Sequence, residues 1–252
     1  MTLQLNNGSA FTELPSAVLL DMDNTLYPYE PAHLAGMGAV QAKAMQLFNV
    51  DRERFNDIFK IARQHVKEQL PGMASSHSRL LYFQRFLELM GLGSQVLIAL
   101  DLEQTYWRTF LNHAVLFEGV REFLEELRLA RIPLVLVTDL TAQIQFKKMV
   151  YLNLDHYFDY IVSSEEVGFD KPHPAPFKLA IEKIKAKGCV WMIGDDPVKD
   201  IQGAKEALGA VTLLLNRDKA QTQAYYQADA EFSDYADLIK IVKRNLTATV
   251  TL

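Results

Sequence analysis

The stretch AVLLDMDNTLY, residues 17–27, runs from four apolar residues directly into two closely spaced acids. A short, partly β-branched apolar run that stops abruptly is typical of a buried strand. Asp21 and Asp23 lie two residues apart just beyond it. If the chain turns at once, both can face one site, where one attacks and the other transfers a proton. For such a pair alone, a polar strand end with Asn24 and Thr25 as turn residues is an equally good interpretation.

The same pattern recurs twice farther along the chain. Apolar residues 133–137 precede Thr138 and Asp139, and residues 190–193 precede an acidic turn. Other predicted strands are 160–163 and 211–215, and predicted helices are 120–130, 142–151, 175–187 and 198–208. This alternation predicts an α/β fold, a doubly wound parallel sheet with helices on both faces and ligands bound outside the carboxyl ends of the strands.

Residues 30–115 interrupt the alternation because they are almost entirely helix-like. The predicted helices are 37–48, 52–69, 78–90 and 95–111, with Pro or Gly in two of the breaks between them. Aromatic residues recur at helical spacing and are interpreted as packing: Phe55, Phe59, Phe83 and Phe86. The pattern predicts an all-helical subdomain inserted after the first acidic strand end.

A second acidic cluster lies in GDDPVKD, residues 194–200. Glycine allows close approach at the strand end, and three acids around one turn suit a hard cation with oxygen ligands. Helix N-capping would explain one of these acids but not all three. A third candidate is Lys171 in KPHP, whose ammonium could meet a phosphate or hold a carboxylate ionised. Taken alone, Lys171 is better interpreted as a solvated loop lysine.

Composition excludes several classes of protein. The 252 residues carry 26 Lys and Arg against 31 Asp and Glu, a formal charge of −5 that leaves no basic excess for nucleic acid. Apolar runs such as 207–216 are far shorter than the roughly 18 residues of a membrane helix. A single cysteine, Cys189, and the absence of a signal-like N-terminus favour a reducing, cytoplasmic setting. We therefore expect neither a nucleic-acid nor a membrane partner.

In chain order, DMDNTLY, Thr138, Lys171 and GDDPVKD resemble the four motifs of the haloacid dehalogenase superfamily, in its phosphatase branch. The resemblance covers roughly residues 16–216. The helical insertion is similar to the first cap class of that superfamily. The resemblance to this superfamily implies a Rossmann-like core domain of residues 1–27 and 117–252 and a cap domain of residues 28–116.

The resemblance also implies a role for each motif residue. Asp21 would be the nucleophile that becomes an aspartyl-phosphate, and Asp23 the general acid and then the base. Thr138 would hydrogen-bond the phosphoryl group, and Lys171 would balance charge. Mg²⁺ would be held by Asp21, the backbone carbonyl of Asp23 and Asp195, with Asp200 behind them and the role of Asp196 open. Six acids would converge on the site with Lys171 as their single opposing cation: Asp21, Asp23, Asp139, Asp195, Asp196 and Asp200.

One residue departs from the superfamily pattern. Asp139 occupies a position where this branch commonly has Asn, and a further carboxylate should repel an anionic substrate. Asp139 is therefore expected to turn away, to stay protonated or to meet a cationic part of the substrate.

Other candidate substrate-binding residues lie near the cap. His77 and Arg79 occupy a break between cap helices and could read the leaving group, or could simply be loop charges. Tyr27 and Tyr29 could line the entrance or pack at the hinge. His33 has no metal-ligand spacing and is assigned an ordinary structural role.

The leading interpretation is a Mg²⁺-dependent phosphatase that hydrolyses a small phosphorylated metabolite through Asp21. A phosphomutase of the same superfamily and a catalytically weak protein that binds a phosphorylated ligand remain alternatives, the latter supported by Asp139 alone. Substrate identity and oligomeric state stay open.

Overall fold

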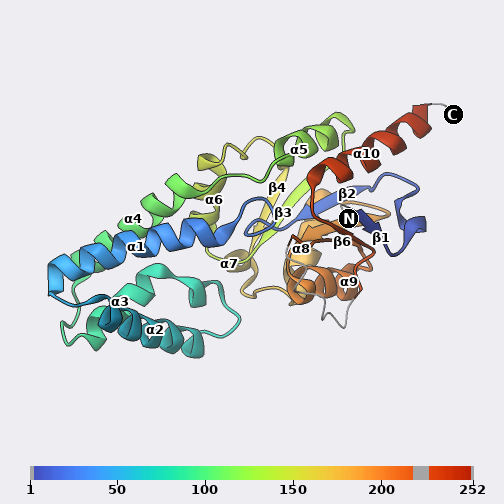
Figure 1. Cartoon of the computed structure of the whole chain (residues 1–252). Coiled ribbons are helices and arrows are strands. Elements are labelled where there is room, and N and C mark those ends of the chain that lie inside the picture. Colours follow the sequence, from blue (N-terminus) through green and yellow to red (C-terminus); the bar gives the residue numbers. More distant parts are fainter. Residues whose placement is uncertain (1–2, 218–226, 251–252) are drawn as a thin grey trace.

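Figure 1 shows the computed structural model of the chain, which describes residues 3–217 and 227–250. Within these residues a seven-stranded sheet has the order β1-β7-β6-β5-β2-β3-β4. The strands are β1 (Leu3–Leu5), β2 (Ala17–Leu20), β3 (Leu134–Thr138), β4 (Tyr160–Ser163), β5 (Val190–Gly194), β6 (Val211–Leu215) and β7 (Ala230–Phe232). All neighbours pair in parallel except β1, which is antiparallel to β7. The predicted fold class is confirmed, although β1 and β7 were not predicted.

Helices cover both faces of the sheet. They are η1 (Gly8–Phe11), α5 (Val120–Leu129), α6 (Ala142–Tyr151), α7 (Ser164–Val167), α8 (Pro174–Ile184), η3 (Pro197–Gln202), α9 (Gly203–Leu208) and α10 (Tyr235–Val250). In Figure 1, α5 and α10 lie on one side of the sheet and α8 and α9 on the other. No helix in the described part of the chain combines the length and apolar character needed to cross a membrane.

The two apolar cores follow from the alternation of side chains along each strand. On β2, Val18 and Leu20 pack into the core shared with α5 and α10, whereas Ala17 and Leu19 pack into the core shared with α8. Every residue of β2, β3 and β5 is buried, as expected for central strands covered on both faces. The central strands are therefore held rigidly, and so are the side chains at their ends.

The insertion between β2 and α5 is helical, as predicted. Its elements are α1 (Tyr29–Phe48), α2 (Arg52–Gln69), η2 (Ala74–His77), α3 (Arg79–Leu89) and α4 (Val96–His113). Asp51 caps α2 by accepting the N–H of Arg54 at 2.8 Å, and Ser78 caps α3 in the same way. Helix α1 begins eight residues before the predicted start, since a proline is tolerated in the first turn of a helix.

Aromatic packing fills the interior of these helices. Phe55, Phe83 and Phe86 are fully buried, and the rings of Phe55 and Phe86 lie 5.0 Å apart. Phe59 stacks on Phe55 but also reaches the cavity described below. The predicted aromatic core of the insertion is therefore present, with Phe59 at its edge.

The two connections between the insertion and the sheet lie side by side. The N–H of Phe117 donates to the carbonyl of Leu26 at 2.9 Å, so the chain leaves and re-enters the core at neighbouring points. Every strand of the sheet lies outside residues 28–116. We propose that these residues form a separate cap domain and that residues 1–27 and 117–252 form the core domain, of which residues 1, 2, 218–226, 251 and 252 lie outside the described part.

Excising residues 31–114 and joining the ends with a short Gly/Ser bridge is expected to leave a folded core. Closing the gap costs little entropy because the ends are already adjacent. The transition temperature should fall, since the ring of Tyr27 loses its edge-on contact with Phe110. Circular dichroism and thermal unfolding, with the intact chain as control, check this. Loss of the cooperative transition would show that cap and core fold as one unit.

Candidate active site

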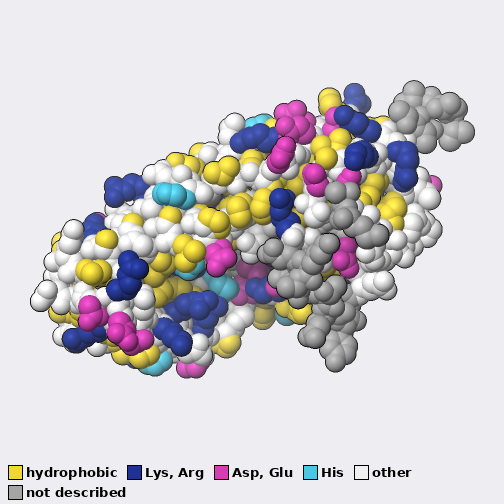
Figure 2. Space-filling view, viewed as in Figure 1, with side chains coloured by type: hydrophobic (Ala, Val, Ile, Leu, Met, Phe, Trp, Pro, Cys, Tyr) yellow, Lys and Arg dark blue, Asp and Glu magenta, His cyan; other side chains and the backbone are white. Residues whose placement is uncertain are grey.

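A cavity of about 370 Å³ lies between the cap helices and the carboxyl edge of the sheet. This volume falls in the range of small-molecule sites. The acidic residues that line it are Asp21, Asp23, Asp139, Asp195, Asp196 and Asp200. The basic residues that line it are Arg63, Lys67, Arg79, Lys148, Lys171 and Lys199. Figure 2 shows a recess between the two parts of the molecule in which acidic side chains are visible, with basic side chains on the cap beside it.

Strand register brings the motif residues together. Leu20, the last residue of β2, pairs with Leu136 of β3 and with Ile193 of β5, so these three parallel strands end within two residues of one another. Asp21, Thr138 and Asp195 follow or end these strands and all line the cavity. The predicted meeting of these side chains at one edge of the sheet is therefore observed.

The chain reverses immediately after β2. Asn24 adopts a left-handed conformation, with φ of 65°, which Asn tolerates better than most residues. Its side-chain oxygen accepts the N–H of Tyr29 at 3.0 Å, and the Thr25 hydroxyl donates to Asp21 at 2.9 Å. This turn allows both Asp21 and Asp23 to face the cavity.

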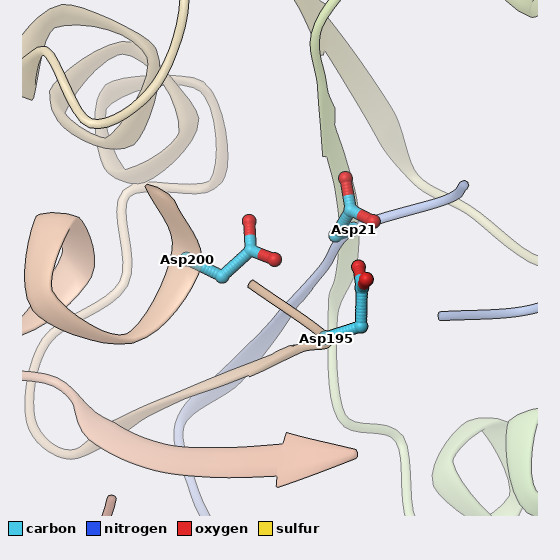
Figure 3. A group of neighbouring side chains, drawn as sticks. All are labelled: Asp21, Asp195 and Asp200. Atoms are coloured by element: carbon cyan, nitrogen blue, oxygen red, sulfur yellow. The ribbon is translucent and has the colours of Figure 1, made fainter. Parts of the chain in front are cut away.

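Three carboxylates converge at the floor of the cavity. Figure 3 shows Asp21, Asp195 and Asp200 turned toward one another, with ligand oxygens that all lie within 4.8 Å. Burial, followed by the charges of Asp21 and Asp200, raises the pKa of Asp195 to about 8. Burial also raises the pKa of Asp200 to about 7, although Lys171 lowers it in part. An oxygen donor set that repels itself in this way fits a hard divalent cation.

Lys171 is the cation at the centre of this group. Its ammonium, 2% exposed, donates to Asp21 at 2.7 Å and to Asp200 at 2.6 Å. A third bond, at 3.0 Å, goes to the carbonyl of Val137 on β3. Burial lowers the pKa of Lys171, but the surrounding carboxylates outweigh it and the net pKa is raised. Lys171 is therefore a fixed charge of the site and not a solvated loop lysine.

Asp23 has different partners, which the sequence did not reveal. The ammonium of Lys148 on α6 donates to both of its carboxylate oxygens at 2.7 Å, and the Tyr27 hydroxyl donates to one of them. Burial raises the pKa of Asp23, but Lys148 and Tyr27 outweigh it and the net pKa is lowered. The Asp23 side chain thus stands apart from the acidic cluster, and its carboxylate is not among the converging ligand oxygens.

Asp139 is neutralised by the protein itself. One of its oxygens accepts the backbone N–H of Lys171 at 2.9 Å, and the other accepts the Lys199 ammonium at 3.0 Å. Lys199 therefore supplies Asp139 with an opposing charge from within the protein, which the three alternatives drawn from the sequence did not include. The expectation that Lys171 alone opposes the acids is wrong, since Lys148 and Lys199 join it.

The remaining motif residues have defined partners. The Thr138 hydroxyl accepts a hydrogen bond from the Gln145 amide at 2.7 Å and lines the cavity. Asp196 caps η3 by accepting the N–H groups of Val198 and Lys199, both at 2.9 Å. Of the three acids in GDDPVKD, Asp196 therefore caps a helix, while the other two belong to the carboxylate cluster.

The two candidate residues of the cap break both line the cavity. His77 bonds to Asp170, the neighbour of Lys171, at 3.0 Å and so joins cap to core. Arg79 donates to the His77 carbonyl at 2.7 Å and to the Tyr29 hydroxyl, and its guanidinium lies over the rings of Tyr106 and Trp107. Tyr29 lines the cavity as well.

The prediction that Tyr27 binds the substrate is not supported by its position in the structure. Its side chain is fully buried and it is not part of the cavity wall, because its ring packs on Phe110 and its hydroxyl points to Asp23. His33, which the sequence left in a structural role, does line the cavity and bonds to the Tyr106 hydroxyl at 2.7 Å.

Lys148 is the most consequential residue that sequence reasoning missed. A signal was present, since Ile144, Gln145, Lys148 and Met149 fall on one face of a helix and all four are buried. A lysine on an apolar helix face requires a partner, because an isolated buried charge is very costly. For Arg63 and Lys67 no such pattern exists, because neither is buried: Arg63 is exposed and Lys67 half-buried, next to the buried Ala62 and Val66.

Residues 15–207 match the haloacid dehalogenase-like hydrolase family. The chain is 35% identical over 241 residues to the ribulose-1,5-bisphosphate 5-phosphatase of Halopiger xanaduensis, covering 91% of this chain and 100% of that protein. It is 31% identical over 208 residues to the glyceraldehyde 3-phosphate phosphatase of Methanopyrus kandleri, covering 81% and 85%. The chain therefore belongs to the haloacid dehalogenase-like hydrolase family, and the resemblance of its motifs is confirmed.

A solved structure of an enzyme that is named for a different reaction has the same fold. The 2-haloacid dehalogenase of Pseudomonas syringae pv. Tomato DC3000 superimposes with a TM-score of 0.69 and 25% identity, over 92% of this chain and 99% of that one. The fold alone therefore does not decide which bond is hydrolysed. That decision belongs to the residues of the site.

Gly194→Ala is expected to disturb the carboxylate cluster. A Cβ at this position would lie 2.3 Å from Oδ2 and 2.4 Å from Cβ of Asp200, so the aspartate would have to move. We expect the free energy of unfolding to fall by about 1–3 kcal/mol, as for other overpacked sites. Gly38→Ala, in open space on α1, is the control and should stabilise by about 0.5–1 kcal/mol. Urea unfolding measures both, and equal effects would contradict the packing argument.

Proposed function

We propose that the protein is a Mg²⁺-dependent phosphatase that hydrolyses the phosphate monoester of a small metabolite through a covalent intermediate on Asp21. What carries the proposal is the pair Asp21 and Asp23 in one cavity, with separate partners. Asp21 contacts Lys171 and the acidic cluster, whereas Asp23 contacts Lys148 and Tyr27. Two carboxylates in different environments can take different roles in one reaction.

Asp21 suits the role of nucleophile. Its Oδ1 accepts Lys171 and its Oδ2 accepts the Thr25 hydroxyl, so the carboxylate is oriented at the floor of the cavity. Attack of one oxygen on phosphorus would form the P–O bond to Asp21 and break the ester bond. Lys171 and Thr138 would then face the oxygens of the phosphoryl group, where cations and hydrogen-bond donors stabilise the transition state.

Asp23 suits the role of acid and base. The leaving alkoxide needs a proton in the first step, and the attacking water must lose one in the second. Lys148, which is bonded to both oxygens of Asp23, positions the carboxylate and can supply it with a proton for the first step. In the second step the ionised carboxylate can accept the proton of the water that hydrolyses the aspartyl-phosphate.

Asp21, Asp195 and, behind them, Asp200 are the side chains that would hold Mg²⁺, together with the backbone carbonyl of Asp23. The metal would neutralise the phosphoryl oxygens during transfer. The self-repelling carboxylates described above support this assignment, because Asp195 has no cation within salt-bridge distance among the described residues.

Asp23 also separates the proposed reaction from dehalogenation. In the superfamily that the motifs resemble, the true dehalogenases lack the second acid of the first motif, because a halide leaves without a proton. The names of the two curated relatives support the same class of substrate, a small phosphorylated sugar or related metabolite.

Phosphate release from a panel of sugar phosphates and p-nitrophenyl phosphate tests the proposal. Activity is expected with Mg²⁺, to vanish in excess EDTA and to return with added Mg²⁺, since the acidic floor would otherwise repel phosphate. Asp21→Asn should abolish turnover and yield no phosphorylated protein in acid-quenched mass spectra. Asp155→Asn, at an exposed turn, is the matched control. Full activity in EDTA, or a phosphoryl adduct on Asp21→Asn, would overturn the mechanism.

The roles of Asp23 and Lys148 predict a dependence on the leaving group. Asp23→Asn should slow hydrolysis of alkyl phosphates on the order of 10²–10⁴-fold, the usual contribution of general acid–base catalysis. Lys148→Met should also slow it. In both variants the release of nitrophenolate in the first turnover should be slowed less than the release of an alcohol, because nitrophenolate leaves without a proton, whereas hydrolysis of the aspartyl-phosphate should stay slow with either substrate.

Lys147→Met, the exposed neighbour on α6, is the control for Lys148→Met. Removing one partner of a buried ion pair also destabilises the fold, so unfolding is measured in parallel. An equal loss in the first turnover with both kinds of leaving group would mean that Lys148 takes no part in protonating the leaving group.

A further inference from the structure

The cap wall of the cavity is basic, in contrast to the acidic floor. Arg63 and Lys67 on α2 and Arg79 on α3 line the cavity, and none of the described cap residues that line it is acidic. Arg63 and Lys67 lie four residues apart, so they share one face of α2. Like charges at this spacing destabilise a helix slightly, and both of these side chains line the cavity.

These cations lack the carboxylate partners that the core lysines have. Within residues 3–217 and 227–250, neither Arg63, Lys67 nor Arg79 forms a salt bridge. Arg79 is instead held by tyrosine hydroxyls and aromatic rings. The basic cap wall of the cavity therefore has no carboxylate in direct contact among the described residues, although Asp170 acts on Lys67 and Asp23 on Arg79 at longer range.

The surroundings of Lys67 point in the same direction. Partial burial lowers its pKa, and the positive charges of Arg63, Lys199 and Arg79 lower it further, whereas the charge of Asp170 raises it in part. Cations from both the cap and the core therefore act on the same ammonium. An anion bound beside Lys67 would reduce a repulsion that Asp170 offsets only in part.

We propose that Arg63 and Lys67 form a second anion subsite, which binds the distal phosphate of a bisphosphorylated substrate while its other phosphate reacts at Asp21. This inference rests on the proposed phosphatase function and names its substrate class. A phosphate dianion matches two adjacent cations better than a single carboxylate does, and arginine binds phosphate oxygens in a forked geometry. The cavity volume, about 370 Å³, is ample for more than one phosphate group.

Kinetics with ribulose 1,5-bisphosphate, ribulose 5-phosphate, 6-phosphogluconate and p-nitrophenyl phosphate test the subsite. The wild type is expected to prefer ribulose 1,5-bisphosphate over ribulose 5-phosphate, which lacks the distal phosphate. Arg63→Gln and Lys67→Gln should each reduce that preference, as a ratio of kcat/KM values, roughly tenfold, the usual effect of losing one charge-assisted hydrogen bond. Glutamine keeps helix propensity, so α2 should still form. Lys60→Gln, an exposed cation of α2 outside the cavity, is the matched control.

A binding measurement keeps the subsite testable without turnover. In Asp21→Asn protein, calorimetry with Mg²⁺ compares ribulose 1,5-bisphosphate and ribulose 5-phosphate, with and without Arg63→Gln and Lys67→Gln. Tighter binding of the bisphosphate that both substitutions weaken supports the subsite. Equal binding of the two ligands, or a preference that survives both substitutions, overturns it.

Two further outcomes distinguish the possible failures. If 6-phosphogluconate, with a distal carboxylate, is preferred and the substitutions remove that preference, the subsite binds carboxylate and the phosphate assignment is wrong. If the wild type does not hydrolyse p-nitrophenyl phosphate or any sugar phosphate, the proposed function fails, and calorimetry alone then decides the subsite.

Discussion

Repulsion among carboxylates at the end of the sheet is the constraint around which this site is organised. The neighbouring parallel strands β2 and β5 end within one residue of each other and bring Asp21 and Asp195 together, while η3 adds Asp200. A single buried ammonium, that of Lys171, contacts two of these acids and a β3 carbonyl. Asp195 receives only the Thr25 hydroxyl at 3.3 Å among the described groups. The negative charge of the cluster is thus balanced at Asp21 and Asp200, while Asp195 can still bind a cation.

Features that depend on local sequence could be predicted. The five longer strands are apolar runs that stop at polar residues, and the pattern needs no knowledge of the fold. Strands β1 and β7 could not be predicted, because each has three residues, too few to show an alternation of apolar and polar side chains. The start of α1 was placed late because its first turn contains Pro31, which is compatible with a helix only at that end.

Features that depend on pairing across the chain could not be predicted in the same way. Lys148 lies 125 residues from Asp23, and Lys199 lies 60 residues from Asp139. The motifs identified the acids, but no local pattern shows which distant lysine neutralises which acid. From the sequence alone, the Asp139 carboxylate is expected to repel an anionic substrate, because the sequence does not show that Lys199 pairs with it. With Lys199 in contact, Asp139 no longer supports a catalytically weak protein.

The residues proposed for catalysis and those proposed for substrate preference lie on different elements, but the two sets are not fully independent. The acids and their lysines come from the sheet edge, η3 and α6, whereas Arg63 and Lys67 come from an insertion that contributes no strand. Tyr27 joins the two, because its hydroxyl contacts Asp23 and its ring packs on Phe110 of the cap. A change in the cap that moves Phe110 would therefore reach the carboxylate proposed to transfer the proton, without altering any residue of the four motifs.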